Sequence, residues 1–462
     1  MDPLAVSGWM IRGPLLVPAL AMVVVAGFRA LRPARLDAHR RGARVVDGRR
    51  AQRSARRRQS SYAQAALTLA GVAIAPRDET KHFKLIGTTG AGKTTAICGL
   101  IEGALRRGDR AVITDPDGGY LARFHHRRRG DAILNPFEPD SVRWDPFAEL
   151  GERWDADQLA AGLIPSSDDT SGREWRGYAR TFVTAVIRRL HDCGERDTSE
   201  LWRLLTVAGS NELRPVVAGT PAQPFLEPDN ARMFGSIRSV TASAVAAFEH
   251  LQGQRGRPFS VRRWVRDGRG VLFVPYRAAQ IAALRSIIAT WIRLAIFEAM
   301  SSRREGADQR LWFVVDELDS LGAIDGLKDA LARLRKFGGR CVLGFQSIAQ
   351  VSSTYGHGEA QTIVENCCST LILRCGASEH GGTSQFASRL IGEREVLRRH
   401  TSRGRDREDG LLSRARRRST NVSEQRISEV AVMASELEQL PDLAGFLKTA
   451  SSTQWLRVSF RP

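Results

Sequence analysis

The chain has 462 residues, of which 42% are hydrophobic and 26% are charged, so its composition excludes a disordered protein and allows two or three domains. The 69 Lys and Arg residues outnumber the 50 Asp and Glu residues, and the net charge of +19 indicates a polyanionic partner: nucleic acid, an anionic membrane face, or both. The six cysteines form no C-x-x-C pair and the nine histidines show no metal-ligand spacing, which excludes a disulfide framework and a zinc site and indicates a reducing compartment.

The first feature along the chain is an apolar stretch, Trp9–Phe28, whose last 16 residues carry no charge. A membrane-spanning helix needs roughly 20 apolar residues, and an interfacial tryptophan and a snorkelling Arg12 would supply the missing length. From Arg29 to Arg58 the chain carries twelve Arg against two Asp, and such a flank stays cytoplasmic. We therefore predict a single-pass membrane anchor at residues 1–30, a basic juxtamembrane linker at 31–60, and a cytoplasmic location for the bulk of the chain.

The alternative to an anchor is a cleaved signal peptide, which would carry its positive charge before the apolar stretch and not behind it. A second apolar stretch, Tyr62–Ala75, is too short to span a membrane, and Pro76 ends it. We interpret this second stretch as a strand and a turn that lead into a nucleotide-binding domain, whose first part covers residues 61–149.

The most specific motif runs from Gly87 to Thr94 and reads G-T-T-G-A-G-K-T, the form G-x-x-x-x-G-K-[ST] of a nucleoside triphosphatase phosphate loop. A strand-like run, His82–Ile86, precedes it and a helical pattern, Thr94–Leu105, follows it, which is the setting that this loop requires. Gly87 and Gly92 allow turns that residues with a Cβ atom resist, so successive N–H groups point into one nest for phosphate. A turn that only happens to hold a lysine is the less favoured alternative.

The expected ligand of this loop is ATP with Mg²⁺. Lys93 would place its charge on the β- and γ-phosphates, and Thr94 would offer its hydroxyl to the metal. The expected nucleotide-binding residues are Gly87, Thr88, Thr89, Gly90, Ala91, Gly92, Lys93, Thr94 and Thr95.

The middle of the chain changes from strand patterns to helical patterns. The run Ala111–Gly118 predicts a buried strand that ends in a turn, with Asp115 expected to cap this turn rather than to lie near the nucleotide. From residue 150 to 251 the apolar residues take helical spacing with few strand-like runs. We predict an all-α domain inserted at 150–251, after which the nucleotide-binding domain resumes at 252–392.

A second motif supports hydrolysis rather than mere binding. Leu311–Val315 is a continuous apolar run, typical of a strand buried on both faces of a parallel sheet, and Asp316 and Glu317 follow it. Ligands of open α/β sheets lie at the carboxyl ends of the strands. Asp316 is therefore expected to help hold Mg²⁺, and Glu317 to orient or deprotonate the attacking water.

Two further residues are candidates with equally plain alternatives. Gln346 ends the predicted strand Cys341–Phe345, where it would be either a sensor of the γ-phosphate or an ordinary loop glutamine. Arg335 closes the predicted helix Ile324–Phe337, where it would be either an arginine finger acting on a neighbouring subunit or a cation at a helix C-terminus.

Taken together, these residues resemble the coupling ATPases of type IV secretion, which deliver plasmid DNA to a conjugation channel. The likeness covers about residues 67–391 and 432–447. The matching motifs are G-T-T-G-A-G-K-T at 87–94, L-N-P-F at 134–137, W-D-P-F-A-E at 144–149, F-V-V-D-E-L at 313–318, R-K-F-G-G at 335–339, G-F-Q-S at 344–347 and M-A-S-E-L-E-Q-L-P-D-L at 433–443.

This resemblance implies an α/β fold: a RecA-like P-loop NTPase domain with a mainly parallel sheet, an inserted all-α domain, and an N-terminal transmembrane helix. It implies a homo-hexamer around single- or double-stranded DNA, anchored in the bacterial inner membrane. The implied partners are the relaxase or relaxosome, the type IV secretion channel components and the membrane. By the same resemblance Lys93, Glu317, Arg335 as the arginine finger and Gln346 as the sensor are the catalytic residues, and Thr94 and Asp316 hold the metal.

The chain departs from the family pattern at both ends. The family usually carries two membrane spans, whereas this chain shows one. Within the C-terminal segment 393–462, the Arg-rich stretch Arg394–Arg418 has no counterpart, and we interpret it as a disordered loop that binds polyanions. Two other functions remain open: a double-stranded DNA translocase of the chromosome-segregation type, and a membrane adaptor that binds nucleotide and recruits a relaxase–DNA complex without pumping.

Overall fold

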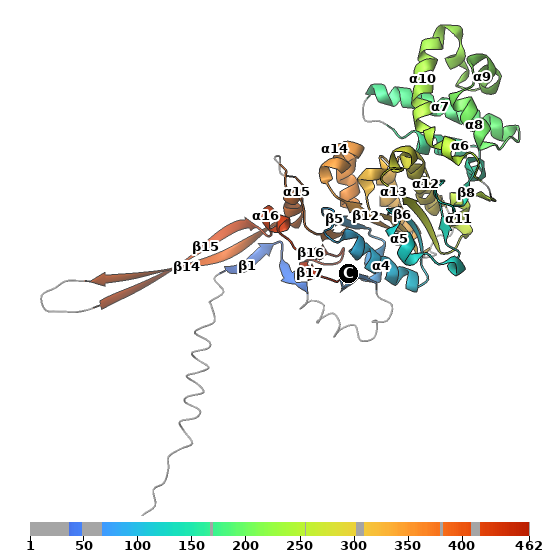
Figure 1. The fold of residues 1–462 in the computed structure, drawn as a ribbon. Coiled ribbons are helices and arrows are strands. Elements are labelled where there is room, and N and C mark those ends of the chain that lie inside the picture. Colours follow the sequence, from blue (N-terminus) through green and yellow to red (C-terminus); the bar gives the residue numbers. More distant parts are fainter. Residues whose placement is uncertain are drawn as a thin grey trace, which may run out of the picture. The chain divides into compact units, whose positions relative to one another are not determined.

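The computed structural model describes residues 37–48, 67–166, 170–254, 256–301, 309–378, 382–407 and 416–461. The centre of the molecule is a ten-stranded sheet in the order β2-β17-β16-β13-β5-β12-β11-β6-β10-β7 (Figure 1). Its strands are β2 Val45–Asp47, β5 Phe83–Ile86, β6 Arg110–Pro116, β7 Ala132–Ile133, β10 Val271–Tyr276, β11 Leu311–Val315, β12 Gly339–Phe345, β13 Ser369–Ile372, β16 Ala444–Lys448 and β17 Trp455–Ser459.

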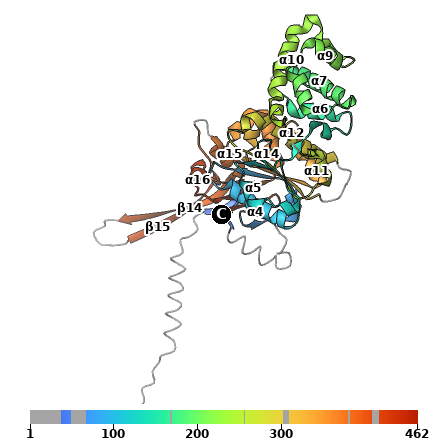
Figure 2. The same cartoon turned by 45° about the vertical axis from the view of Figure 1, so that its right-hand side comes forward.

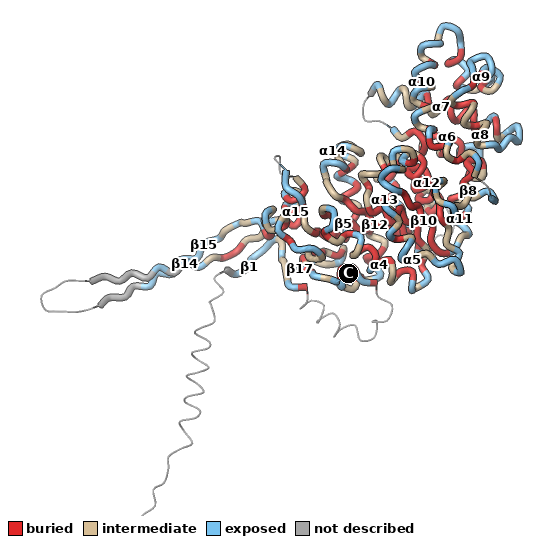
Figure 3. Tube along the Cα trace, in the orientation of Figure 1, coloured by how far each residue is buried: buried red, intermediate tan, exposed pale blue. Residues whose placement is uncertain are grey.

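The sheet is parallel from β13 to β7, and only the pairs β13–β16 and β16–β17 are antiparallel. Every residue of β5, β10, β11 and β12 is buried, as Figure 3 shows by colour, which is why these strands read as continuous apolar runs in the sequence. The predicted α/β fold with a mainly parallel sheet is confirmed.

Helices lie on both faces of the sheet, α4 and α5 on one side and α12, α13 and α14 on the other (Figures 1 and 2). Side chains point alternately to the two faces of the sheet along each strand, so both faces can pack against helices. On one face, Ala111 and Ile113 of β6 share an apolar cluster with residues of α4. The bounds are α4 Lys93–Arg106, α5 Gly119–Phe124, α11 Val261–Asp267, α12 Ile281–Ser301, α13 Leu327–Leu334, α14 Ile348–Asn366, α15 Gly382–Ile391 and α16 Ala434–Glu438. A short β3–β4 hairpin, Thr68–Leu69 with Val72–Ala73, and a turn-like helix α3, Pro76–Glu79, precede the sheet.

Between residues 155 and 251 the described chain forms helices and turns. The α-helices are α6 Asp155–Leu163, α7 Thr170–Asp192, α8 Thr198–Thr206, α9 Ser210–Val217 and α10 Ala231–Ala244. Before and after this segment, the short strands β8 (Arg143–Trp144) and β9 (Pro258–Phe259) pair with each other. The helical segment therefore leaves the part of the chain that forms the ten-stranded sheet, and returns to it, at one neck.

A separate compact unit holds β1 Asp37–Gly42, β14 Glu393–Arg407 and β15 Arg416–Val430 in a three-stranded antiparallel sheet. The interpretation of Arg394–Arg418 as a disordered loop is wrong for the described part, since β14 and β15 pair in unbroken register from Glu393–Val430 to Arg407–Arg416. Acidic partners on the opposite strand neutralise the first arginines: Arg394 lies 2.8 Å from Glu429, and Arg399 lies 2.7 Å from Glu424.

The predicted anchor at residues 1–30 lies outside the described residues, as does most of the linker at 31–60. The part of that linker that is described forms β1 and β2. Among the described helices, none combines the length and the apolar character that a membrane crossing requires.

Candidate functional site

The loop from Gly87 to Gly92 leaves the end of β5 in the middle of the sheet and leads directly into α4. Gly90 and Gly92 have φ values of 77° and 108°, a region that residues with a Cβ atom avoid. Gly87 was predicted to allow a turn, but the structure gives a different reason for this glycine. A Cβ atom at Gly87 would lie 3.0 Å from Cβ of Leu373, so there is little room for a side chain. The loop therefore depends on positive φ at two glycines and on close packing at the third.

Lys93 is the first residue of α4 and is 7% exposed. Its Nζ donates hydrogen bonds to the carbonyl oxygens of Gly87, at 2.7 Å, and Thr88, at 3.2 Å. The ammonium group thus lies over the inner face of the loop. Burial lowers the pKa of Lys93, and the nearby carboxylates of Asp316 and Glu317 act against that shift.

Asp316 follows β11 and meets the phosphate loop across the sheet edge. Its Oδ2 accepts hydrogen bonds from Oγ1 of Thr94, at 2.7 Å, and from the hydroxyl of Tyr120, at 2.9 Å. Its Oδ1 is buried and has no hydrogen-bond partner among the described residues. Mg²⁺ prefers oxygen ligands. The hydroxyl of Thr94 and the carboxylate of Asp316 therefore fit a Mg²⁺ ion bound beside the phosphates.

Glu317 and Gln346 form a second connection between the strand ends and the loop. Gln346 Nε2 donates to Oε1 of Glu317, at 2.6 Å, and its Oε1 accepts from Oγ1 of Thr89, at 3.1 Å. Burial, and then the charge of Asp316, raises the pKa of Glu317. The parallel strands β5, β11 and β12 thus bring Lys93, Glu317 and Gln346 to one edge of the sheet.

Arg335 is the predicted site residue that the fold does not bring to this edge. It lies in the turn after α13, its side chain is exposed, and no hydrogen bond or ion pair in the described part of the chain joins it to the loop. Ala91 and Thr95 lie where they were predicted, in the loop and in the first turn of α4.

Sequence reasoning missed two residues that shape this edge. Tyr120, in the first turn of α5, reaches Asp316 as described. Leu443, near the C-terminus, has a φ of 58°, donates its N–H to the carbonyl of Ala91 at 3.1 Å, and would lie 2.6 Å from a Cβ atom on Gly92. The motif that contains Leu443 was visible in the sequence, but its contact with the loop was not.

Two predicted motif residues have structural roles that the contacts make plain. Asp115 accepts hydrogen bonds from the backbone N–H groups of Tyr120, at 3.0 Å, and Leu121, at 2.6 Å, so the expected capping role is confirmed. Glu149 is buried at the neck of the helical segment, where it accepts from Nε1 of Trp144, at 2.8 Å, and Oγ of Ser260, at 2.8 Å.

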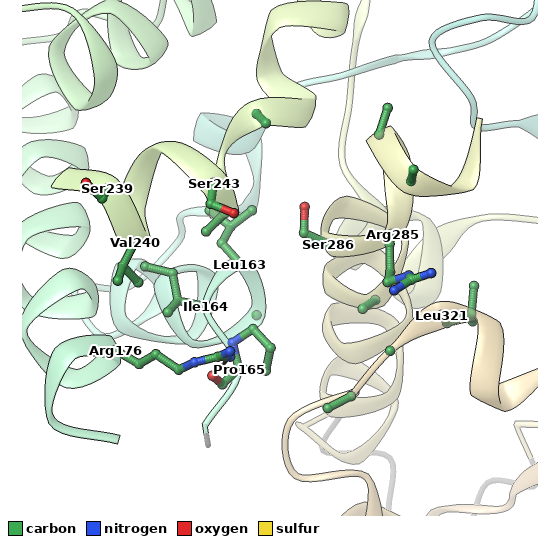
Figure 4. A pocket seen from close by; sticks show the side chains of 18 residues that line it. Leu163, Ile164, Pro165, Arg176, Ser239, Val240, Ser243, Arg285, Ser286 and Leu321 are labelled. Carbon is green, nitrogen blue, oxygen red and sulfur yellow. Dashed lines mark hydrogen bonds between the residues drawn. The ribbon is translucent and has the colours of Figure 1, made fainter. Parts of the chain in front are cut away.

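A cavity of about 690 Å³ lies between the helical segment and α12 (Figure 4). Arg176 reaches it from α7, and Arg285 and Ser286 reach it from α12, whereas none of the predicted site residues lines it. In the described part of the chain, no group of His, Cys, Asp or Glu side chains is arranged to hold a metal ion by itself. The candidate site is therefore the edge around Lys93 and Asp316.

Comparison with known proteins gives a family match over residues 66–461, to the type IV secretion-system coupling protein DNA-binding domain. The coupling protein TraD of Escherichia coli K12 is 30% identical over 393 residues, which cover 83% of this chain and 53% of TraD. The coupling protein VirD4 of Bartonella quintana is 23% identical over 62% of this chain and 49% of its own length. The chain thus spans about half the length of the curated relatives that it matches.

Solved structures of the conjugative coupling protein TrwB agree with this match. The unbound form of TrwB lacking its N-terminus has a TM-score of 0.79 and 30% identity, and the likeness covers 92% of this chain and 94% of that one. A TrwB complex with ADP and Mg²⁺ has a TM-score of 0.79 and 29% identity over the same shares. A further TrwB complex contains a non-hydrolysable ATP analogue.

Proposed function

The chain belongs to the type IV secretion-system coupling proteins, and we propose that it is an ATPase that drives DNA transfer during conjugation. The observation that carries this proposal is the 2.7 Å hydrogen bond from Thr94 to Asp316, which joins the phosphate loop to the acidic end of β11. A hydroxyl and a carboxylate held together beside a phosphate loop form the arrangement that Mg²⁺-dependent hydrolysis requires. The solved TrwB complex with ADP and Mg²⁺ supports the choice of ligand.

In the proposed reaction, the N–H groups of the loop and the charge of Lys93 hold the β- and γ-phosphates. Thr94 and Asp316 would hold Mg²⁺, and a bound Mg²⁺ ion would supply positive charge beside the phosphate oxygens. Because Lys93 already lies against the carbonyl groups of Gly87 and Thr88, phosphate would replace backbone oxygens as its partner.

Glu317 is proposed to orient and deprotonate the attacking water. Its raised pKa supports this role, because a carboxylate that holds a proton more tightly is a stronger base. Gln346 donates to Glu317 and accepts from Thr89, so it would sense whether the γ-phosphate is present and adjust the position of the base.

Arg335 is proposed to act in trans. Its exposed position and its lack of contact with the loop of its own chain support a finger that reaches a neighbouring subunit, where it would stabilise transition-state charge. The proposal therefore includes a ring, a homo-hexamer by family resemblance, with ATP bound between subunits.

The proposed partners follow from the family and from the charge. DNA would pass through the ring, and basic side chains of the protein would contact the DNA phosphates. DNA binding should therefore weaken with salt and depend little on base sequence. The helical segment 150–251 would meet the relaxase or relaxosome. The apolar N-terminal stretch would anchor the chain in the inner membrane beside the secretion channel.

The experiment is ATP turnover by the full-length chain in detergent, alone and with single- or double-stranded DNA. Turnover should rise with DNA and fall by about 10²–10⁴-fold in Glu317→Gln, because the general base is lost. Glu365→Gln is the matched control, since Glu365 is exposed on α14 and bonds Gln361. Preference for double-stranded DNA would favour a chromosome-segregation type of translocase, and no turnover under any condition would contradict the ATPase proposal and favour a nucleotide-binding adaptor.

A further inference from the structure

Tyr120 is a buried side chain that the proposed reaction does not yet use. It is 1% exposed, and its hydroxyl donates to Oδ2 of Asp316 at 2.9 Å. Its backbone is held in turn, because the N–H of Tyr120 donates to Oδ1 of Asp115 at 3.0 Å. The first turn of α5 therefore holds a hydroxyl against the carboxylate that follows β11.

The two donors leave the carboxylate of Asp316 in one defined orientation. Thr94 and Tyr120 both donate to Oδ2, whereas Oδ1 is buried and has no hydrogen-bond partner among the described residues. Gly344 of β12 lies against Oδ1, since a Cβ atom on Gly344 would lie 3.0 Å from Oδ1. A carboxylate on a strand end would otherwise be free to rotate about its terminal torsion.

A simpler explanation is that a buried phenol needs some acceptor, and Asp316 happens to supply it. Tyr355 shows that the fold satisfies a buried phenol without an acid. It is 3% exposed, and its hydroxyl bonds the carbonyl of Gly322, at 3.3 Å, and the N–H of Ile324, at 3.2 Å. Burial of a phenol in this fold therefore does not by itself require an acid partner.

We propose that Tyr120 is a positioning residue that orients Asp316 and thereby sets the affinity of the site for Mg²⁺ with nucleotide. The inference rests on the proposed function, since it assigns a role at the same site. Residues that hydrogen-bond a metal ligand orient that ligand, and their loss commonly costs about 10–100-fold in metal affinity or activity. Tyr120→Phe removes the hydroxyl alone and keeps the ring in the core.

The test measures binding of a fluorescent ATP analogue to the full-length chain, first in EDTA and then with increasing Mg²⁺. In Tyr120→Phe the Mg²⁺ concentration at half-saturation should rise about tenfold or more, while binding in EDTA stays as in the unchanged chain. Tyr355→Phe is the matched control and should leave the Mg²⁺ requirement unchanged. Melting temperatures of both variants show whether a difference comes from the fold.

A double variant separates orientation of Asp316 from a general effect. In the Asp316→Ala background, Tyr120→Phe should change the Mg²⁺ requirement no further, because its target is gone. The assignment is overturned if Tyr120→Phe matches the unchanged chain, if Tyr355→Phe causes the same shift, or if the two changes at Tyr120 and Asp316 simply add. An unchanged chain that binds no nucleotide would instead overturn the proposed function, and this assignment with it.

Discussion

Single residues at the site are constrained mainly by the space around them. The sequence does not explain why position 344, in the G-F-Q-S motif, is a glycine. In the structure, a Cβ atom on Gly344 would lie 1.9 Å from the carbonyl oxygen of Asp316 and 3.0 Å from Oδ1 of Asp316. Gly99, on the exposed face of α4, has nothing within 4 Å of the same position. The two glycines therefore predict opposite effects of one methyl group.

We predict that Gly344→Ala lowers the free energy of unfolding by about 3 kcal/mol or more, because β11 and β12 must separate to admit the methyl group. Gly99→Ala should raise it by about 0.5–1 kcal/mol, since alanine favours the helix. Chemical denaturation of the two variants checks both signs, and a Gly344→Ala protein as stable as the original would contradict the packing argument.

At the scale of elements, His82 joins three parts of the nucleotide-binding domain. It precedes β5, its Nε2 lies 2.9 Å from the carbonyl oxygen of Leu331 in α13, and its Nδ1 accepts from the N–H of Cys341 in β12 at 3.1 Å. The second bond requires an unprotonated Nδ1. Burial lowers the pKa of His82 to about 4, and the neighbouring charge of Arg335 also disfavours the cation.

We predict that this histidine makes the domain less stable in acid. Since the folded pKa lies below the unfolded value of about 6.5, the unfolded state binds more protons between pH 4 and 6.5, and stability falls as the pH drops through that window. The loss should be about 2 kcal/mol between pH 7 and pH 5. Denaturation at the two pH values should show a smaller difference for His82→Asn than for a control, His126→Asn, which changes an exposed histidine. Equal differences would refute this role.

The neck of the helical segment depends on one buried carboxylate. Glu149 is 2% exposed and accepts from Trp144 and Ser260 side chains and from the N–H of Val261, at 2.7 Å. Burial raises its pKa, whereas these donors act in the opposite direction. The W-D-P-F-A-E motif therefore closes the point where the helical segment leaves and rejoins the domain.

We predict that Glu149→Ala destabilises the neck by about 3–5 kcal/mol, because several buried donors lose their acceptor. Hydrogen exchange should become faster in β8 and β9, while the sheet around β11 keeps its protection. Glu152→Ala, which changes an exposed residue beside the neck, should leave exchange unchanged. Unaltered exchange in Glu149→Ala would mean that the neck is held by other contacts.

At the scale of the whole molecule, Lys93 supplies a cation at the phosphate loop, whereas the proposed finger Arg335 is exposed and, among the described residues, has no hydrogen bond or ion pair with that loop. The proposed finger would therefore act on the site of a neighbouring subunit. We predict that Arg335→Ala and Lys93→Ala are each inactive alone. Equal mixtures of the two variants should recover up to about one quarter of the original ATP turnover, because randomly assembled rings contain some sites with both groups intact.

Mixing Lys93→Ala with Glu317→Gln is the control, and it should recover nothing since both residues serve the site of their own chain. No recovery at any ratio would refute action in trans.

The sequence by itself determined the α/β fold, the phosphate loop and the acid pair after β11, because each depends on a local pattern: a glycine spacing, a continuous apolar run, a helical period. Spacing left Gln346 and Arg335 open, and only the family resemblance chose between their alternatives. Tertiary structure alone decided that Tyr120 reaches Asp316 across 196 positions, that Glu149 meets Ser260 across 111, and that the Arg-rich segment pairs as a hairpin. The physical reason is that these contacts join groups brought together only when the sheet assembles, and no local pattern of residues records such neighbours.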